Sequence, residues 1–356
     1  MSGSTLAIET PLAALHRAGG ASMGEWFGCA LPNDWGNAAA EERFAVESVA
    51  LIDKNYRAYL AFAGPDRVRY LNAILTNSVR ELGEGQGIVS LLLNPQGRIL
   101  AEIETYVLGE RLFCVSYAMI RARLVEWLEK YIIMDDVTLT DETERFGMLA
   151  VEGPRSGEVV KELTGLELPA MGELRLVDVS VDGVSCKVMG RSPGGVMGAE
   201  FLAERSDLER LWGALSSAAR GAGGGPMGYA ALSARRLTQG IPWFGYDFGE
   251  QQIPHEAGLE LSHISYTKGC YTGQEIVERV RSRGQVNRRR ARLQFEGGVV
   301  PSAGASLAVD GKEVGQVTRA SRSFYPPAIL GMGYVRKEHA EAGSIVEWSL
   351  GQAKVL

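Results

Sequence analysis

Lys268-Gly269-Cys270-Tyr271-Thr272-Gly273-Gln274-Glu275 places one cysteine directly ahead of a predicted helix. Thr272 and Glu275 have the spacing of a capping box, so Thr272 is the expected N-cap and Glu275 the expected reciprocal cap. Cys270 would then lie two residues outside a helix N-terminus with Lys268 close by, and both features favour a thiolate. The stretch therefore predicts a reactive cysteine. The alternative is a half-buried cysteine beside an ordinary capped helix.

The same stretch matches every fixed position of K-G-C-Y-x-G-Q-E and resembles the signature of the YgfZ family. Residues 253–257 (Ile-Pro-His-Glu-Ala) and 264–266 (Ile-Ser-Tyr) also fit that family. YgfZ proteins bind folate and help to maintain iron–sulphur enzymes. The resemblance implies that Cys270 is a nucleophile or a transient iron ligand and that Lys268 supports its charge. It also implies roles for residues around the cysteine, with Tyr266 either lining the folate pocket or simply packing, and with Tyr271, Gln274 and Glu275 supporting the motif.

Composition indicates an ordinary globular protein. The chain has 356 residues, of which 46% are apolar and 22% charged, and a net charge of -6. Its length predicts two or three domains, and its charge does not favour a general nucleic-acid binder. The four cysteines are scattered without a C-x-x-C pair, which predicts neither a zinc site nor a disulfide framework and fits a reducing compartment. The N-terminal stretch does not resemble a secretory signal, and no apolar run approaches the ~20 residues of a membrane span. We therefore expect a cytoplasmic protein with no membrane or nucleic-acid partner.

Hydrophobic periodicity predicts an α+β lobe between residues 56 and 144. It has helices at 66–77 and 122–131, and it has strands at 56–63, 88–93, 99–107, 112–117 and 137–140. The β-α-β-β-α-β order suggests a split βαβ unit. A similar order recurs in residues 148–219. After about residue 290, short strands separated by turns such as Asp310-Gly311 predict a small barrel or sandwich.

The whole chain resembles the superfamily of the glycine-cleavage T-protein, an aminomethyltransferase related to YgfZ. The resemblance rests on motifs spread along the chain, which are Thr10-Pro11-Leu12, Gly64-Pro65-Asp66, Asn94-Pro95-Gln96-Gly97, Val151-Glu152-Gly153-Pro154 and the run from Arg236 to Asp247. It implies an α+β fold of the T-protein/YgfZ type, a three-lobed cloverleaf with two split-βαβ-like lobes and a C-terminal small β-barrel. The expected domains are a discontinuous folate-binding lobe of 1–55 with 145–265, a second α+β lobe of 56–144, the signature loop and helix of 266–284, and a barrel of 285–356.

Two departures from the transferase pattern affect the expected function. The transferases carry an acidic pair where this chain has Ala101-Glu102, although Glu102 retains a carboxylate that would accept hydrogen bonds from a pterin. Met197 stands near the place of another lost acid, whereas Glu200 matches a retained one. Glu200 is a candidate pterin contact or an exposed strand glutamate. Arg236 matches a family arginine that would meet the glutamate tail of folate, or it forms a surface salt bridge.

The first hypothesis is therefore a folate-binding accessory factor for iron–sulphur cluster assembly or repair. It would use tetrahydrofolate or a one-carbon derivative, hold no permanent metal, and work with iron–sulphur enzymes or assembly proteins. The alternative is a folate-dependent aminomethyltransferase or demethylase. A third hypothesis is an interaction module that uses the seven arginines between Arg279 and Arg292, which otherwise form a solvated face and salt bridges.

Overall fold

The computed structural model describes residues 7–284 and 286–356. Residues 1–6 lie outside the described part. They begin the N-terminal stretch that we expect not to be a secretory signal. The chain forms two compact units, and the first comprises the described residues up to Arg67 together with Leu82–Ile88 and Glu104–Leu232. The second unit comprises Val68–Glu81, Val89–Ile103 and Ser233–Leu356. Each unit is therefore assembled from segments that are distant in the sequence.

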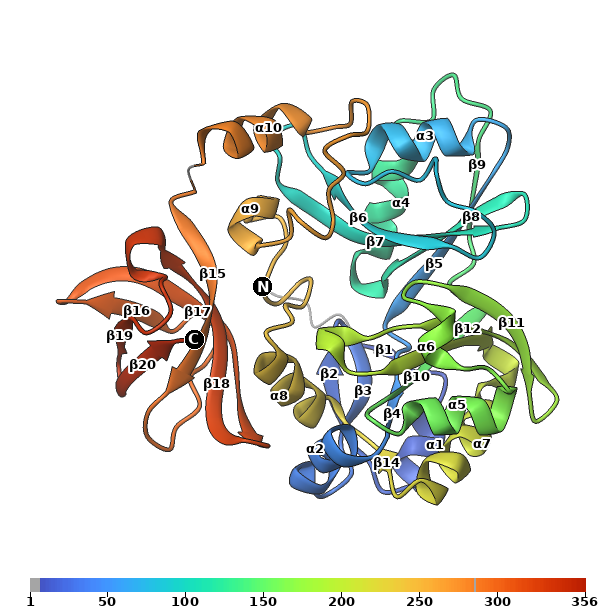
Figure 1. Ribbon diagram of the computed structural model, residues 1–356, viewed down its shortest axis with the longest axis horizontal. Helices are drawn as coiled ribbons and strands as arrows, with labels where there is room; N and C mark the ends of the chain where they lie inside the picture. Colours follow the sequence, from blue (N-terminus) through green and yellow to red (C-terminus); the bar gives the residue numbers. More distant parts are fainter. Residues whose placement is uncertain (1–6, 285) are drawn as a thin grey trace. The chain divides into compact units, whose positions relative to one another are not determined.

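A six-stranded sheet forms the centre of the first unit. Its order is β11 (Leu176–Val181), β12 (Val184–Gly190), β13 (Gly198–Glu204), β10 (Phe146–Glu152), β4 (Ala50–Asp53) and β14 (Gly225–Pro226). Helices α5 (Ser156–Thr164) and α7 (Leu208–Gly221) pack together against this sheet (Figure 1). In α7 the residues Leu208, Leu211 and Leu215 are completely buried, because their spacing places them on one helical face.

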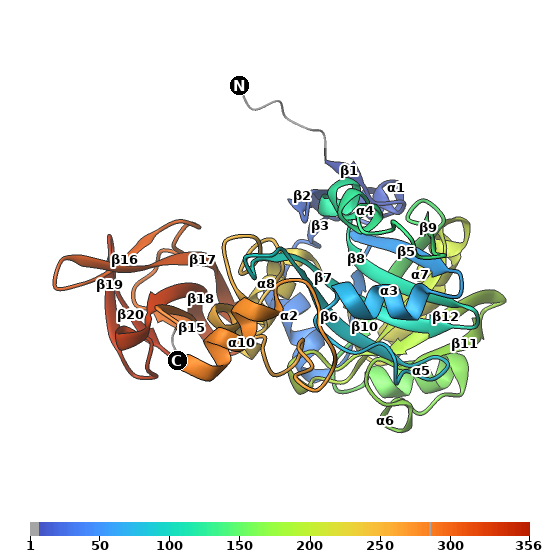
Figure 2. The same ribbon diagram turned by 90° about the horizontal axis from the view of Figure 1, so that it is seen from above.

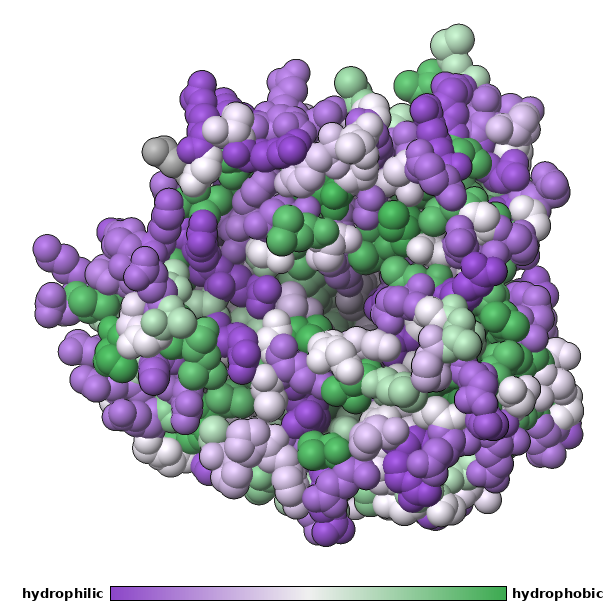
Figure 3. Space-filling view, in the orientation of Figure 1, coloured by the Kyte–Doolittle hydropathy of each residue, from purple (hydrophilic) through white to green (hydrophobic). Residues whose placement is uncertain are grey.

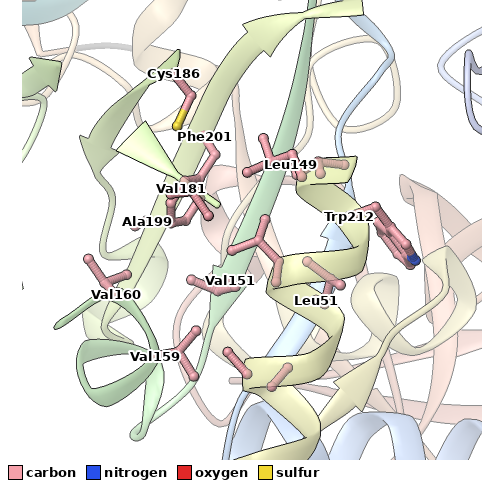
Figure 4. Packing of buried hydrophobic residues seen from close by; sticks show 14 of the residues in the cluster. Leu51, Leu149, Val151, Val159, Val160, Val181, Cys186, Ala199, Phe201 and Trp212 are labelled. Atoms are coloured by element: carbon pink, nitrogen blue, oxygen red, sulfur yellow. The ribbon is translucent and has the colours of Figure 1, made fainter. Parts of the chain in front are cut away.

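The strands of this sheet supply two hydrophobic cores. Leu149, Val151 and Phe201 point toward α5 and α7 and pack with Leu51 and Trp212 (Figure 4). Their neighbours along the strands point to the opposite face and join a second cluster with Tyr59 and Tyr106. Because both faces are covered, the residues of β10 and β13 are buried almost continuously rather than at alternate positions.

A small sheet and its helices complete the N-terminal part of the first unit. Its strand order is β1 (Ile8–Glu9), β3 (Cys29–Asp34) and β2 (Ser22–Trp26), and its helices are α1 (Ala13–Ala18) and α2 (Ala38–Glu47). Shorter elements elsewhere in this unit are the helix α6 (Leu168–Met171) and the 3-10 turns η1 (Ala118–Ile120), η2 (Pro193–Gly195) and η3 (Arg205–Asp207).

All the strands and helices predicted between residues 56 and 144 are present. The strands form a five-stranded sheet in the order β6 (Gly87–Leu93), β7 (Ile99–Leu108), β8 (Arg111–Tyr117), β5 (Arg57–Ala63) and β9 (Thr138–Asp141). The helices are α3 (Arg67–Ile74) and α4 (Arg121–Glu129). The three strands β6, β7 and β8, all of which were predicted, separate the helices along the chain, so the element order is β-α-β-β-β-α-β and the expected β-α-β-β-α-β order is wrong. Strands β6 and β7 run through both compact units.

The predicted C-terminal barrel is confirmed. It closes in the order β15 (Arg288–Phe295), β18 (Pro327–Arg336), β17 (Lys312–Phe324), β16 (Ser306–Val309), β19 (Ile345–Trp348) and β20 (Gly351–Val355). Figure 2 shows these strands wrapped around one interior, which Leu293, Phe295 and Val317 help to fill. Asp310 and Gly311 both have positive φ, at 49° and 71°, and join β16 to β17 in a two-residue hairpin turn. Closure leaves no open sheet edge.

The second unit also contains the helices around the cysteine motif. These are α8 (Tyr229–Gln239), which begins in the first unit, α9 (Pro254–Ala257) and α10 (Gln274–Arg283), with the 3-10 turn η4 (Lys337–His339) in the barrel.

Hydrophilic side chains predominate on the face shown in Figure 3, and hydrophobic ones lie between them in smaller groups. Within the described residues, no helix is both long and apolar enough to cross a bilayer.

Candidate functional site

Lys268 binds the C-terminal end of helix α3. Its Nζ atom donates to the carbonyl oxygens of Asn72 at 2.7 Å and Asn77 at 2.9 Å, and also to that of Leu75. Carbonyls at a helix end have no partner within the helix, so the ammonium satisfies groups that would otherwise need water. Burial lowers the pKa of Lys268 to about 8, so the amine is mainly protonated at neutral pH. All three donors of the ammonium are thus used by the segment 72–77.

Cys270 is exposed, whereas Tyr271 is buried, with the Lys268 ammonium 5.3 Å from the centre of its ring. We call residues 267–273 the Cys270 segment. Its far end is fixed by packing, because Gly273 has φ of 83° and a Cβ there would lie 2.7 Å from the carbonyl oxygen of Asn94. A residue with a side chain would therefore clash with the turn between β6 and β7.

The expected capping box at Thr272 and Glu275 is wrong. Helix α10 begins at Gln274 with Gly273 as its N-cap, and no side chain caps it. The tight approach of Gly273 to Asn94 sets the helix start. Gly97 of the same turn is equally close, since a Cβ there would lie 2.9 Å from the side chain of Ile276. Long-range packing has overridden the local capping signal, and Glu275 is exposed.

Glu102 is held by a histidine. The Nε2 atom of His263 lies 3.0 Å from Oε1 of Glu102, and the two side chains are 10% and 17% exposed. The Nδ1 atom of His263 lies 2.7 Å from the hydroxyl of Ser262, and the backbone oxygen of His263 accepts a hydrogen bond from Thr76 at 2.6 Å. His263 is therefore the residue that orients the carboxylate of Glu102.

Glu200 lies in the first unit and is buried, so the alternative of an exposed strand glutamate is wrong. Its Oε1 atom is 3.0 Å from Nζ of Lys54, while its Oε2 atom is buried and has no hydrogen-bond partner among the described residues. Burial opposes ionisation of Glu200, but the positive charges of Lys54, Arg191 and Arg57 outweigh it and lower the pKa of the carboxyl to about 2. Glu200 is therefore an ionised buried acceptor.

A second buried carboxylate anchors the surrounding cations. The Oε1 atom of Glu104 accepts hydrogen bonds from Arg57 at 2.6 Å and from Arg191 at 3.1 Å. Its Oε2 atom accepts one from the hydroxyl of Tyr106 at 2.9 Å. Sequence reasoning missed Lys54, Arg57 and Glu104. The available signal was the presence of charged residues within or beside strands that are otherwise buried and apolar, since such charges are rare unless paired.

Arg236 and Tyr266 both lie in the second unit. Arg236 is 4% exposed and donates to the side chain of Gln239 at 3.2 Å, so the alternative of a surface salt bridge is wrong. The hydroxyl of Tyr266 lies 3.2 Å from Nε2 of His255, and the guanidinium of Arg281 lies 4.1 Å from the centre of the Tyr266 ring. The structure thus describes Glu102, Arg236, Tyr266, Lys268 and Cys270 in one unit and Glu200 in the other.

The arginine-rich run divides into two parts. Alternate arginines of β15 bond inside the second unit, with Arg288 donating to Glu256 at 3.1 Å, Arg290 to the carbonyl of Ala257 at 2.7 Å and Arg292 to the carbonyl of Thr238 at 2.9 Å. The other four arginines of the run are exposed, three of them on α10 (Arg279, Arg281 and Arg283) and one on β15 (Arg289). About half of the run therefore has a structural role.

Comparison with known proteins gives one consistent result. Residues 12–264 match the GCVT N-terminal domain and residues 288–355 match the glycine cleavage T-protein C-terminal barrel domain. The chain is 29% identical over 330 residues to an aminomethyltransferase of Rubrobacter xylanophilus, covering 93% of this chain and 87% of the relative. It is 28% identical over 340 residues to an aminomethyltransferase of Streptomyces avermitilis, covering 94% and 91%.

A solved structure confirms the fold. The glycine cleavage system aminomethyltransferase T from Bartonella henselae superposes with a TM-score of 0.88 at 22% identity, covering 98% of this chain and 96% of that one. These similarities support the T-protein superfamily and do not single out its YgfZ branch. With two domain models matching in order over most of its length, the chain belongs to the glycine cleavage T-protein family.

Proposed function

We propose that this protein binds a reduced folate and acts in one-carbon transfer of the aminomethyl type. The observation that carries the proposal is Glu200, whose buried and ionised carboxylate keeps one oxygen without a partner among the described residues. A pterin ring offers adjacent N–H and amino donors, which suit a carboxylate acceptor. Glu200 therefore fits a pterin anchor, and Lys54 would hold its carboxylate in place. The names of the relatives support the same activity class.

Glu102 would be the acidic group nearest to the chemistry. Tetrahydrofolate would supply the amine nitrogens that accept the one-carbon unit. The bond from His263 fixes one oxygen of Glu102 and orients the carboxylate. A carboxylate held in this way can accept a proton or a hydrogen bond at a defined position, and such positioning matters on a scale of about 1 Å. We assign Glu102 to this role and Arg236 to the glutamate tail of folate.

Calorimetric titration with tetrahydrofolate tests the binding step. We expect Glu200→Gln to weaken binding at least about ten-fold, because a charge-assisted acceptor is lost. Glu158→Gln on the exposed face of α5 is the matched control and should bind like the wild type. Absence of a binding signal in the folded wild-type protein would refute the proposal.

A second candidate function is support of iron–sulphur enzymes, and the observation that favours it is the exposure of Cys270 within the K-G-C-Y-x-G-Q-E motif. Two variants separate the candidates. Aminomethyl transfer from a lipoyl carrier should fail in Glu102→Gln and persist in Cys270→Ala. Iron–sulphur support should fail in Cys270→Ala when the variant is expressed in a deletion strain, while tetrahydrofolate binding persists. Full iron–sulphur enzyme activity with Cys270→Ala would exclude the second candidate.

A further inference from the structure

A cavity of about 390 Å³ lies within the second unit, lined by α9, the segment that follows it, α10 and the start of β15. One part of its wall is apolar and includes Leu261, Val280 and Val286 together with the ring of Tyr266. Leu261 is 93% exposed, so its side chain is open to solvent at the edge of the cavity. This wall suits the organic body of a small molecule rather than an inorganic ion.

The basic side chains of the cavity differ in what they contact. Arg290 is fixed by the carbonyl oxygens of Ala257 at 2.7 Å and Gly240 at 3.2 Å. The side chain of Arg289 is exposed and has no hydrogen bond or ion pair with the residues described, 7–284 and 286–356. Arg281 rests on the Tyr266 ring and is 3.6 Å from Glu278. Arg281 and Arg289 are therefore the cations that remain available to an anionic group.

The acidic and neutral polar groups limit the charge of a ligand. Glu260 lines the cavity, and its Oε2 atom is buried without a partner in the described part of the chain. His255 lines it too, with Nε2 3.2 Å from the Tyr266 hydroxyl and a buried Nδ1 that likewise has no described partner. Burial lowers the pKa of His255, so its imidazole is neutral at pH 7. Glu256 also lines the cavity and accepts a hydrogen bond from Arg288 at 3.1 Å. Two carboxylates in the wall disfavour a multiply charged anion, whereas two cations suit a single carboxylate.

We propose that this cavity binds a small organic monocarboxylate with an apolar body, and that binding restrains the Cys270 segment. The Cys270 segment is connected at both ends to elements that line the cavity. Tyr266 precedes the Cys270 segment directly, and α10, which carries Val280 and Arg281, follows it directly. A ligand that contacts both walls would hold the two ends of the segment together. The residues that line this cavity do not include Glu102, Glu200 or Arg236, which we assign to folate.

The test uses the full chain, with phenylacetate as the probe. Titration calorimetry measures the binding of phenylacetate. Phenylacetate should bind one site saturably, and Arg281→Gln and Arg289→Gln should each weaken it at least about five-fold. Arg279→Gln and Arg283→Gln change neighbouring arginines that do not line the cavity, so they are matched controls and should have no effect. Saturating tetrahydrofolate should leave the affinity unchanged.

Three outcomes would overturn the proposal. One is the absence of saturable binding, and another is equal binding of phenethylamine or inorganic phosphate, since neither combines a single negative charge with an apolar body. The third is unchanged affinity in both cavity variants. The link to Cys270 has its own measurement, which is the rate of iodoacetamide alkylation. Saturating phenylacetate should slow alkylation at least about two-fold in the wild type and not in Arg281→Gln, and an unchanged wild-type rate would refute the restraint.

Discussion

The Nζ atom of Lys54 lies 3.0 Å from Oε1 of Glu200 in the interior of the first unit, with the two side chains only 9% and 3% exposed. The sheet brings them together. Ala150 of β10 pairs with Ile52 of β4 on one side and with Glu200 of β13 on the other, and Lys54 follows β4 directly. A buried ion pair of this kind is costly to break, because removing one partner leaves an uncompensated charge.

Replacement of Glu200 should therefore destabilise the protein. We expect Glu200→Gln to lower the free energy of unfolding by about 3 kcal/mol, because Lys54 loses its direct partner. Urea denaturation followed by circular dichroism measures the change. The control is Glu158→Gln, which removes an exposed ion pair with Arg155 and should cost less than about 0.5 kcal/mol. Similar losses in the two variants would contradict the buried pairing.

The same pair predicts a pH dependence of stability. The pKa of Glu200 is lowered from 4.5 to about 2 in the folded protein, with burial opposing the shift and Lys54, Arg191 and Arg57 causing it. Stabilisation by a carboxyl with a lowered pKa is complete above its unfolded value and is lost as the pH falls toward the folded one. The stability difference between wild type and Glu200→Gln should therefore be largest above about pH 5 and should narrow toward pH 2. A difference that stays constant over this range would contradict the shift.

Cys270 should be the one thiol that reacts in the native protein. All four cysteines are described, and the other three are buried, with burial raising the pKa of Cys29 to about 11, of Cys114 to about 12 and of Cys186 to about 11. Iodoacetamide at pH 8 should add one label, which Cys270→Ser should abolish and which unfolding in urea should raise to four. Intact-mass spectrometry measures the labels. Rapid native labelling of a second cysteine would contradict the packing.

The two glycines at the ends of α10 should differ in how much stability the protein loses when each is replaced by alanine. Gly273 and Gly284 have positive φ, but a Cβ on Gly273 would lie 2.7 Å from the oxygen of Asn94, whereas a Cβ on Gly284 would have nothing within 4 Å. Gly284→Ala should cost about 1 kcal/mol of unfolding free energy through backbone strain alone. Gly273→Ala should cost at least about 2 kcal/mol because the clash adds to the strain. Thermal or urea unfolding measures the two losses. Equal losses of unfolding free energy in the two variants would show that the turn between β6 and β7 moves away from the new side chain.

Loss of the Lys268 ammonium should weaken the second unit. Lys268→Met removes the donor that serves the carbonyls of Asn72, Leu75 and Asn77, so we expect about 2 kcal/mol of destabilisation. Lys161→Met, which changes an exposed lysine on α5, is the control. Hydrogen exchange at the end of α3 should accelerate in Lys268→Met. Unchanged exchange there would mean that the ammonium does not support this helix end.

The sequence by itself determined the local elements and the T-protein superfamily, but not the branch within it. Strands and helices between residues 56 and 144, the barrel strands and the Asp310-Gly311 hairpin turn follow from side-chain periodicity and from backbone conformations that few residues adopt. These signals are carried by neighbours in the chain, so they can be read without a fold.

Only the tertiary structure decided which distant groups meet. The sequence does not show that Lys54 neutralises Glu200, that His263 orients Glu102 or that Lys268 binds the end of α3, because each contact joins residues 146, 161 or more than 190 positions apart. The start of α10 gives the clearest case. Local spacing favours a cap at Thr272, but the helix begins at Gln274, since close packing of Gly273 on Asn94 outweighs one capping hydrogen bond.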